Sequence, residues 1–135
     1  MERFLGKYSP YLYAVLRIVA GLMFAMHGTQ KLFSWPVPGP PQLNSMMLAA
    51  GIIEFVCGVL IAIGFLTGYA AFIASGQMAV AFFYQHFPDP KGPLPIANGG
   101  ELAVLYCLVF LYIASRGAGP WSVDALLRRG RPATL

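Results

Sequence analysis

The chain consists of long apolar runs separated by short polar or proline-rich segments. A membrane-spanning helix needs about 20 predominantly apolar residues. Runs of this kind predict four spans, at about residues 11–33, 44–66, 68–87 and 98–115. Asn44 or Ser45 can cap the second span, and a very short turn at Thr67-Gly68 leads into the third. The pattern therefore predicts an all-α membrane protein, a four-helix transmembrane bundle that runs up, down, up and down.

Two proline-rich segments interrupt the apolar pattern, SWPVPGPPQLN at residues 34–44 and PDPKGPLP at residues 88–95. Because proline lacks the N–H group that a helix interior needs, both segments are predicted to be loops. After the fourth span, SVDALLRR predicts a short interfacial helix capped by Ser122. We expect residues 1–125 to form a single membrane domain, followed by a basic tail over residues 126–135.

The composition agrees with a membrane location. Hydrophobic residues make up 58% of the 135 residues and charged residues only 10%, whereas a typical soluble domain has about 25% charged residues. These values exclude an ordinary soluble enzyme and a disordered chain. A net charge of +4 does not predict nucleic-acid binding, because the sequence has no basic stripe with interleaved aromatic residues. The expected partner is the lipid bilayer.

The basic residues near the span ends predict the orientation. The terminal segments carry six of them, Arg3, Lys7, Arg116, Arg128, Arg129 and Arg131. The segments next to the two loops carry only Lys31 and Lys91. Because cytoplasmic segments are enriched in Lys and Arg, both termini are predicted to be cytoplasmic.

Ionisable residues inside the spans are the first candidates for function, since a charge at the bilayer centre costs at least about 2.5–3.5 kcal/mol. Glu54 lies near the midplane of the second span and Arg17 in the inner third of the first. At 1.5 Å per residue their depths differ by roughly 8 Å, which long side chains can bridge. The sequence thus predicts an Arg17–Glu54 pair. Such a pair either serves a site or only neutralises its own charges and stabilises the bundle.

Small residues share one face with these charges on each of the first two spans. The two faces are Arg17, Gly21, Phe24, Gly28 and Lys31, and Met47, Gly51, Glu54, Gly58 and Ile61. Steps of three and four residues place each set on one side of its helix. Both faces are therefore predicted to be packing seams.

A second polar group is predicted near the outer ends of the spans. His27 lies about one turn below Lys31, and Glu101 opens the fourth span at a similar level. Together they predict a small polar pocket under the two loops, with Gln30 and His86 at its rim. Alternatively, Lys31 extends to the lipid head groups and Glu101 only favours the positive end of its helix. One deep histidine with distant carboxylates does not favour a metal site.

The remaining candidates carry less information. Gln77 and Tyr84 are the main polar features of the third span. Tyr84 and Tyr106 either belong to an interfacial aromatic belt or line a pocket for a flat lipid-soluble ring. The cysteines, Cys57 and Cys107, lie in apolar runs without a CxxC pattern, so we expect buried free thiols, or a bridge only if both lie at one depth.

Four segments in this order resemble the DoxX family of small bacterial membrane proteins. They are R-x3-G-x6-G-x2-K from Arg17 to Lys31, GIIEFVCGVLIAIGFLTGYAA, NGGELAVLY and GAGPWSVD. The resemblance maps family motif positions onto Arg17, Gly28, Lys31, Glu54, Asn98, Glu101, Ser122 and Asp124. It departs at Gly68, where many relatives have an arginine. It implies a four-helix membrane bundle in the bacterial inner (cytoplasmic) membrane.

The resemblance also implies a link to redox chemistry. Related DoxD-type proteins look like membrane subunits of a thiosulfate:quinone oxidoreductase, and other relatives are linked to oxidative-stress handling. This implies a subunit or accessory of a quinone-linked oxidoreductase, with no built-in cofactor but with a quinone and a redox partner protein as partners. In that case Glu54 or Glu101 would exchange protons, and His27 or Lys31 would hold a carbonyl oxygen.

Two other classes of function fit the same residues. A non-catalytic scaffold or assembly factor would use the charges to organise the bundle or a partner helix. A small carrier for a weak acid or metabolite would have Arg17 and Glu54 on its path. Because four helices enclose only a narrow pore, a carrier would require a homo-oligomer.

Overall fold

The computed structural model describes residues 1–130, and its regular secondary structure over that part of the chain is entirely helical. The elements are α1 (Glu2–Leu5), the 3₁₀-helix η1 (Gly6–Tyr8), α2 (Ser9–Phe33), α3 (Ser45–Ile63), α4 (Thr67–Ala81), the π-helix η2 (Phe82–His86), α5 (Pro95–Asn98), α6 (Glu101–Arg116) and α7 (Val123–Arg129). The segment 131–135, which holds part of the predicted basic tail, lies outside the described residues.

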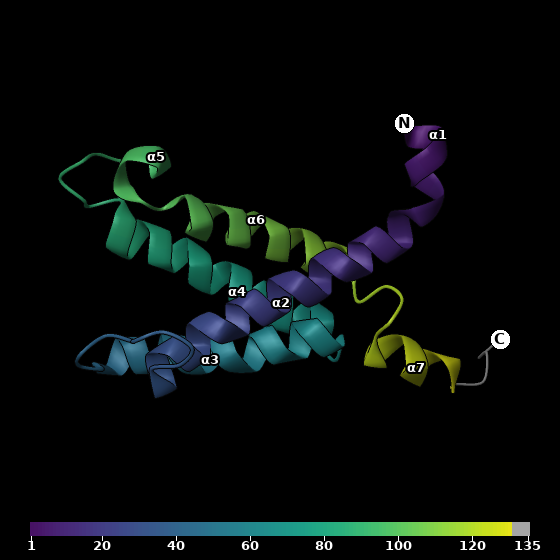
Figure 1. Ribbon diagram of the computed structural model, residues 1–135, viewed down its shortest axis with the longest axis horizontal. Helices are drawn as coiled ribbons and strands as arrows, with labels where there is room; N and C mark the ends of the chain where they lie inside the picture. The colour runs from purple at the N-terminus through teal and green to yellow at the C-terminus, as the bar shows by residue number, and fades with distance from the viewer. Residues whose placement is uncertain (131–135) are drawn as a thin grey trace.

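The four long helices pack side by side in pairs. α2 lies against α3, α4 lies against α6, and α3 joins the two pairs through α4. All four contribute to one apolar core, through residues such as Phe24, Ile61, Ala74 and Phe110. In Figure 1 the N-terminus and α7 lie at one end of the long axis, and the loop before α3 and helix α5 lie at the other. We call the two ends, with the residues nearest to each, the terminal end (residues 1–17, 61–67 and 116–130) and the loop end (residues 27–54 and 77–106).

Glycines set the distance and the register between α2 and α3. A Cβ atom on Gly21 would lie 2.6 Å from the backbone nitrogen of Ala62, and one on Gly58 would lie 2.5 Å from that of Ala25. Gly28 meets the backbone of Phe55 in the same way. Because real Cβ atoms cannot approach so closely, only glycine permits this contact. The predicted seams on the first two spans are confirmed.

The predicted cap of α3 is confirmed, but several predicted helix boundaries differ from the structure. The side chain of Asn44 accepts a hydrogen bond from the backbone N–H of Met47 and so caps α3. The turn after α3 comes earlier than predicted, because Gly64 adopts a left-handed conformation (φ 72°) and Thr67 already begins α4. At the other end, Gly99 (φ 73°) ends α5, so α6 begins at Glu101 and not near Asn98.

Within residues 1–130, two helical segments are long and apolar enough to cross a membrane, Glu2–Phe33 and Ser45–Ile63. α4 and α6 have only 15 and 16 residues, although η2 continues α4 as far as His86. Large apolar side chains are exposed on all four long helices, for example Leu22, Ile52, Phe72 and Leu105. An apolar surface of this extent is typical of contact with lipid.

Candidate functional site

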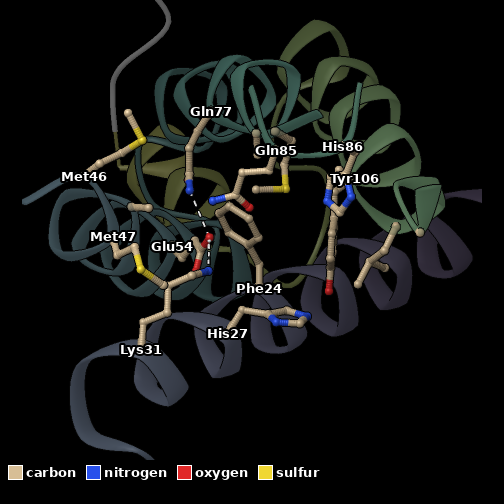
Figure 2. Close-up of a pocket in the computed structure, with 16 residues that line it drawn as sticks. Phe24, His27, Lys31, Met46, Met47, Glu54, Gln77, Gln85, His86 and Tyr106 are labelled. Carbon is tan, nitrogen blue, oxygen red and sulfur yellow. Dashed lines mark hydrogen bonds and ion pairs between the residues drawn. The ribbon is translucent and has the colours of Figure 1, made fainter. Parts of the chain in front are cut away.

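A cavity of about 240 Å³ lies among α2, α3, α4, η2 and α6, toward the loop end (Figure 2). Its walls are mostly apolar and include the aromatic ring of Phe24 and the thioethers of Met46, Met47 and Met78. The polar side chains that line it are His27, Lys31, Glu54, Gln77, Gln85, His86 and Tyr106. An apolar cavity with a few convergent polar groups is the usual form of a small-molecule site.

The centre of the polar lining is a hydrogen-bonded network on Glu54. Lys31 Nζ lies 2.7 Å from Oε1 and 2.6 Å from Oε2 of Glu54, and Gln77 Nε2 donates to Oε1 at 2.9 Å. The Glu54 side chain is 3% exposed and that of Lys31 is 25% exposed. The network thus joins α2, α3 and α4 around one buried carboxylate, as Figure 2 shows.

The predicted Arg17–Glu54 pair is wrong. The antiparallel register brings Gly21 to Ala62 and Gly28 to Phe55. It therefore places Arg17 near Gly64, the C-cap of α3, and not near Glu54 in the middle of that helix. Lys31 reaches Glu54 instead. The prediction compared depths within each span separately, whereas the glycine contacts fix how the two helices are aligned.

Arg17 forms a different centre at the terminal end. It is fully buried, and its guanidinium donates to four backbone carbonyls, those of Ile61, Ala62, Pro120 and Trp121, at 2.7–3.2 Å. These bonds tie the end of α3 to the segment before α7. Arg17 therefore holds backbone segments together at this end and lies outside the cavity.

Asp124 connects α7 to the start of α4 at the terminal end. Its carboxylate accepts hydrogen bonds from the backbone N–H groups of Leu66 and Thr67 and from the hydroxyl of Thr67, and so caps the start of α4. Partial burial opposes ionisation, but these hydrogen bonds and nearby Arg128 hold the pKa of Asp124 below its ordinary value. Ser122 caps α7 as predicted, by accepting from the N–H of Ala125.

The predicted outer group is only partly assembled. His27 and Lys31 both line the cavity, and His86 lies in its wall with Nδ1 3.1 Å from the carbonyl oxygen of Asn98. Glu101 is exposed at the start of α6 and does not line the cavity. Tyr84 is 62% exposed and faces a neighbouring groove.

Two polar atoms in the cavity wall are buried without a hydrogen-bond partner among residues 1–130, the hydroxyl of Tyr106 and Oε1 of Gln77. The ring of Tyr106 meets that of His27 edge to face, with centroids 6.1 Å apart. Buried polar groups are nearly always paired. Unpaired ones beside a cavity therefore indicate that a ligand or water completes them.

Part of this wall was not predicted from the sequence. Gln85 was not a candidate, and it reaches the cavity from η2, where the N–H of Phe87 bonds the carbonyl of Phe82 at 2.8 Å. Such π-helical turns are rare in proteins overall, and those that occur often lie at functional sites. The segment FFYQH contains no glycine or proline that would signal the change of pitch. Cys57 and Cys107 are free thiols, one of the two states expected for them.

Comparison with known proteins identifies the family. The DoxX family model matches residues 12–87. An uncharacterized protein of Haemophilus influenzae is 47% identical over 89% of this chain and 93% of its own length. An uncharacterized membrane protein of Mycobacterium tuberculosis is 28% identical over 94% of this chain and 88% of its own length. No solved structure matches the chain. This chain is a membrane protein and belongs to the DoxX family.

Proposed function

We propose that this protein binds the head group of a membrane quinone in the cavity around Glu54 and serves as the membrane subunit of a quinone-linked redox complex. The observation that carries the proposal is the buried Lys31–Glu54–Gln77 network, which borders a cavity containing the unpaired hydroxyl of Tyr106.

The proposal includes a membrane arrangement in which α2, α3, α4 with η2, and α6 cross the bilayer of the bacterial inner membrane. The terminal end carries Arg3, Lys7, Arg116, Arg128 and Arg129. The terminal end therefore faces the cytoplasm, according to the excess of basic residues on that side. The cavity, toward the loop end, then lies in the outer half of the membrane.

The size and chemistry of the cavity suit a single substituted ring. A cavity of about 150 Å³ is enough for benzene, and this one measures about 240 Å³. A quinone ring has two carbonyl oxygens that accept hydrogen bonds, and Lys31 and Tyr106 supply donors on the cavity wall. Gln77 Oε1 supplies an acceptor for a hydroxyl of the reduced ring.

The charged pair itself favours a functional role. Replacing a buried ion pair by apolar residues is often neutral or stabilising, so stability alone does not explain a lysine and a glutamate in this position. Reduction of a quinone adds two electrons and two protons. Glu54 is the carboxylate on the cavity wall that can exchange protons, with Lys31 as its counter-ion. We propose that the electrons come from a redox partner protein.

Binding of a water-soluble quinone tests the proposal directly. The purified protein in nanodiscs is titrated with tail-free 2,3-dimethoxy-5-methyl-1,4-benzoquinone, and binding is measured by equilibrium dialysis with radiolabelled compound. We expect saturable binding that Gln77→Leu abolishes. Gln30→Leu is the matched control, because the Gln30 side chain bonds the carbonyl of Pro38 outside the cavity.

Two results would contradict the proposal. If the wild type does not bind the quinone, and Gln77→Leu reduces only the recovery of other subunits with the purified protein, the protein would be a scaffold. Saturable binding of a small carboxylic acid in place of the quinone would favour a carrier.

A further inference from the structure

A second hollow adjoins the cavity. It is a groove of about 310 Å³ between α3 and α4. The groove and the cavity share five lining residues, Met46, Ala50, Gln77, Ala81 and Gln85. They are therefore continuous, and Gln77 stands at their junction with its amide hydrogen-bonded to Glu54 on the cavity side.

The far side of the groove is apolar and exposed. Its other lining residues are Ala49, Ile53, Ile73, Val80 and Tyr84. Ile73 is 51% exposed and Val80 is 63% exposed. In a membrane protein, exposed aliphatic side chains on a long helix face the hydrocarbon of the bilayer. The groove thus leads from the polar cavity sideways into the lipid.

The packing of the helices explains why the opening lies here. α3 packs less extensively against α4 than against α2, where glycines bring the backbones together. On the groove side the facing positions include Ala49, Ala50 and Ala81, whose small side chains leave space between the two helices. Along α3 the groove extends from Met46 to Ile53, a length of about 10 Å at 1.5 Å per residue.

We propose that this groove holds the aliphatic tail of the ligand whose ring occupies the cavity, and that the ligand enters laterally from the bilayer between α3 and α4. The inference rests on the proposed quinone site and makes its substrate class specific. That class is a long-chain, membrane-dissolved quinone. The groove acts by steric fit, because a tail gains little free energy when it leaves lipid for an equally apolar protein surface.

Filling the groove tests the inference without touching the cavity. Ala49→Trp and Val80→Trp introduce a large ring from either wall of the groove, at positions that line the groove and not the cavity. Val59→Trp is the matched control, on α3 at a partly exposed position outside the groove. Having two groove variants allows the test to proceed if one of them folds poorly.

The measurement is displacement of the radiolabelled tail-free benzoquinone from nanodiscs by the unlabelled tail-free compound or by its decyl-substituted homologue. We expect both compounds to displace the label from the wild type and from Val59→Trp. In the groove variants the decyl compound should bind at least about tenfold more weakly, because overpacking excludes its tail. The tail-free compound should keep its affinity within about twofold in all variants.

The outcomes separate the two proposals. Unchanged binding of the decyl compound in the groove variants would overturn the groove assignment and leave the quinone site intact. So would a wild type that binds the tail-free compound and not the decyl compound. A wild type that binds neither compound would overturn the quinone site and this inference with it.

Discussion

At the terminal end Arg17 donates hydrogen bonds to four backbone carbonyls, whereas at the loop end Lys31 and Glu54 bind each other beside a cavity. Both centres contain a buried charge on the α2–α3 seam. They differ in what the charge contacts. The bonds of Arg17 hold the backbone together, and its one unpaired nitrogen in the described part of the chain, Nε, lies outside the cavity. Near Glu54, the hydroxyl of Tyr106 and Oε1 of Gln77, which have no partner among residues 1–130, belong to the cavity wall.

This difference shows which buried charges mark a site. A charge inside a membrane segment is a functional candidate by default, and both centres meet that criterion. Their hydrogen-bond partners distinguish the two centres. Replacing a side chain that bonds the backbone carbonyls of two segments breaks the connection between those segments and destabilises the fold. A side-chain ion pair that borders a cavity can be replaced as a pair by apolar residues with little effect on the fold. The following substitutions test this distinction.

The largest effect is expected from Arg17→Met. It leaves four carbonyls without their donor, and we expect the free energy of unfolding to fall by about 3–5 kcal/mol. Thermal unfolding in mild detergent measures the loss. Arg116→Met, at an exposed position where the guanidinium lies over the ring of Tyr13, is the control and should change stability by less than about 1 kcal/mol. A stable Arg17→Met protein that had lost quinone binding would reverse the roles of the two centres.

A smaller effect is expected at the loop end. Lys31→Met removes the counter-ion of a carboxylate that is 3% exposed and should cost about 2–3 kcal/mol, since Lys31 itself is partly exposed. Adding Glu54→Met should restore most of this stability, because no buried charge remains unpaired. Both proteins should fail to bind the quinone. A double variant as unstable as the single one, measured by the same unfolding assay, would mean that the pair is structural.

The sequence predicted the elements well and their alignment poorly. Apolar runs, prolines and the caps Asn44 and Ser122 located the four long helices and α7 to within a few residues, whereas α1, η1 and α5 were not predicted. The repeat of small residues identified the α2–α3 seam correctly. Which residues face each other along the seam depends on how far one helix is shifted against the other, and that shift follows from backbone contacts at Gly21 and Gly58. The partner of Glu54 was mispredicted for this reason.

The candidate site was predictable in part. His27, Lys31, Glu54 and Gln77 were named from the rarity of polar residues in apolar runs, and all four line the cavity. Glu101 met the same criterion but lies outside, because the break at Gly99 makes it the first residue of α6 and leaves it exposed. The methionines carried no signal, since an apolar residue on a helix is core or lining according to packing alone. Gln85 is polar and lies within the predicted third span, so the criterion that identified Gln77 applied to it as well, but it was not named.

Asp124 at the terminal end should give a moderate effect that depends on pH. Asp124→Ala removes the cap of α4 and should cost about 1 kcal/mol at neutral pH. Burial raises the pKa of Asp124, but the hydrogen bonds from Thr67 and Leu66 lower it by more, so the folded-state pKa lies below its ordinary value of 3.8. Its contribution is therefore complete above the ordinary pKa and is lost as the pH falls through the folded pKa.

Unfolding of wild type and Asp124→Ala between pH 6 and pH 3 measures this dependence. The difference between the two proteins should narrow toward the acidic end. Asp89→Ala, in the loop between η2 and α5, is the control, because among residues 1–130 its carboxylate bonds only the nearby N–H of Lys91. A stability difference that widens on acidification would contradict the assigned role of Asp124.

The smallest effect on the fold is expected from Tyr106→Phe, which makes it the sharpest test of the loop end. The hydroxyl of Tyr106 has no partner within residues 1–130, so its removal should change the free energy of unfolding by less than about 0.5 kcal/mol. If the hydroxyl donates to a ring carbonyl, affinity for the tail-free quinone should fall by about two- to tenfold, which corresponds to one hydrogen bond. Tyr112→Phe, on the same helix and exposed, should alter neither quantity. A Tyr106→Phe protein that loses stability and keeps its affinity would show that the hydroxyl serves the core and not the cavity.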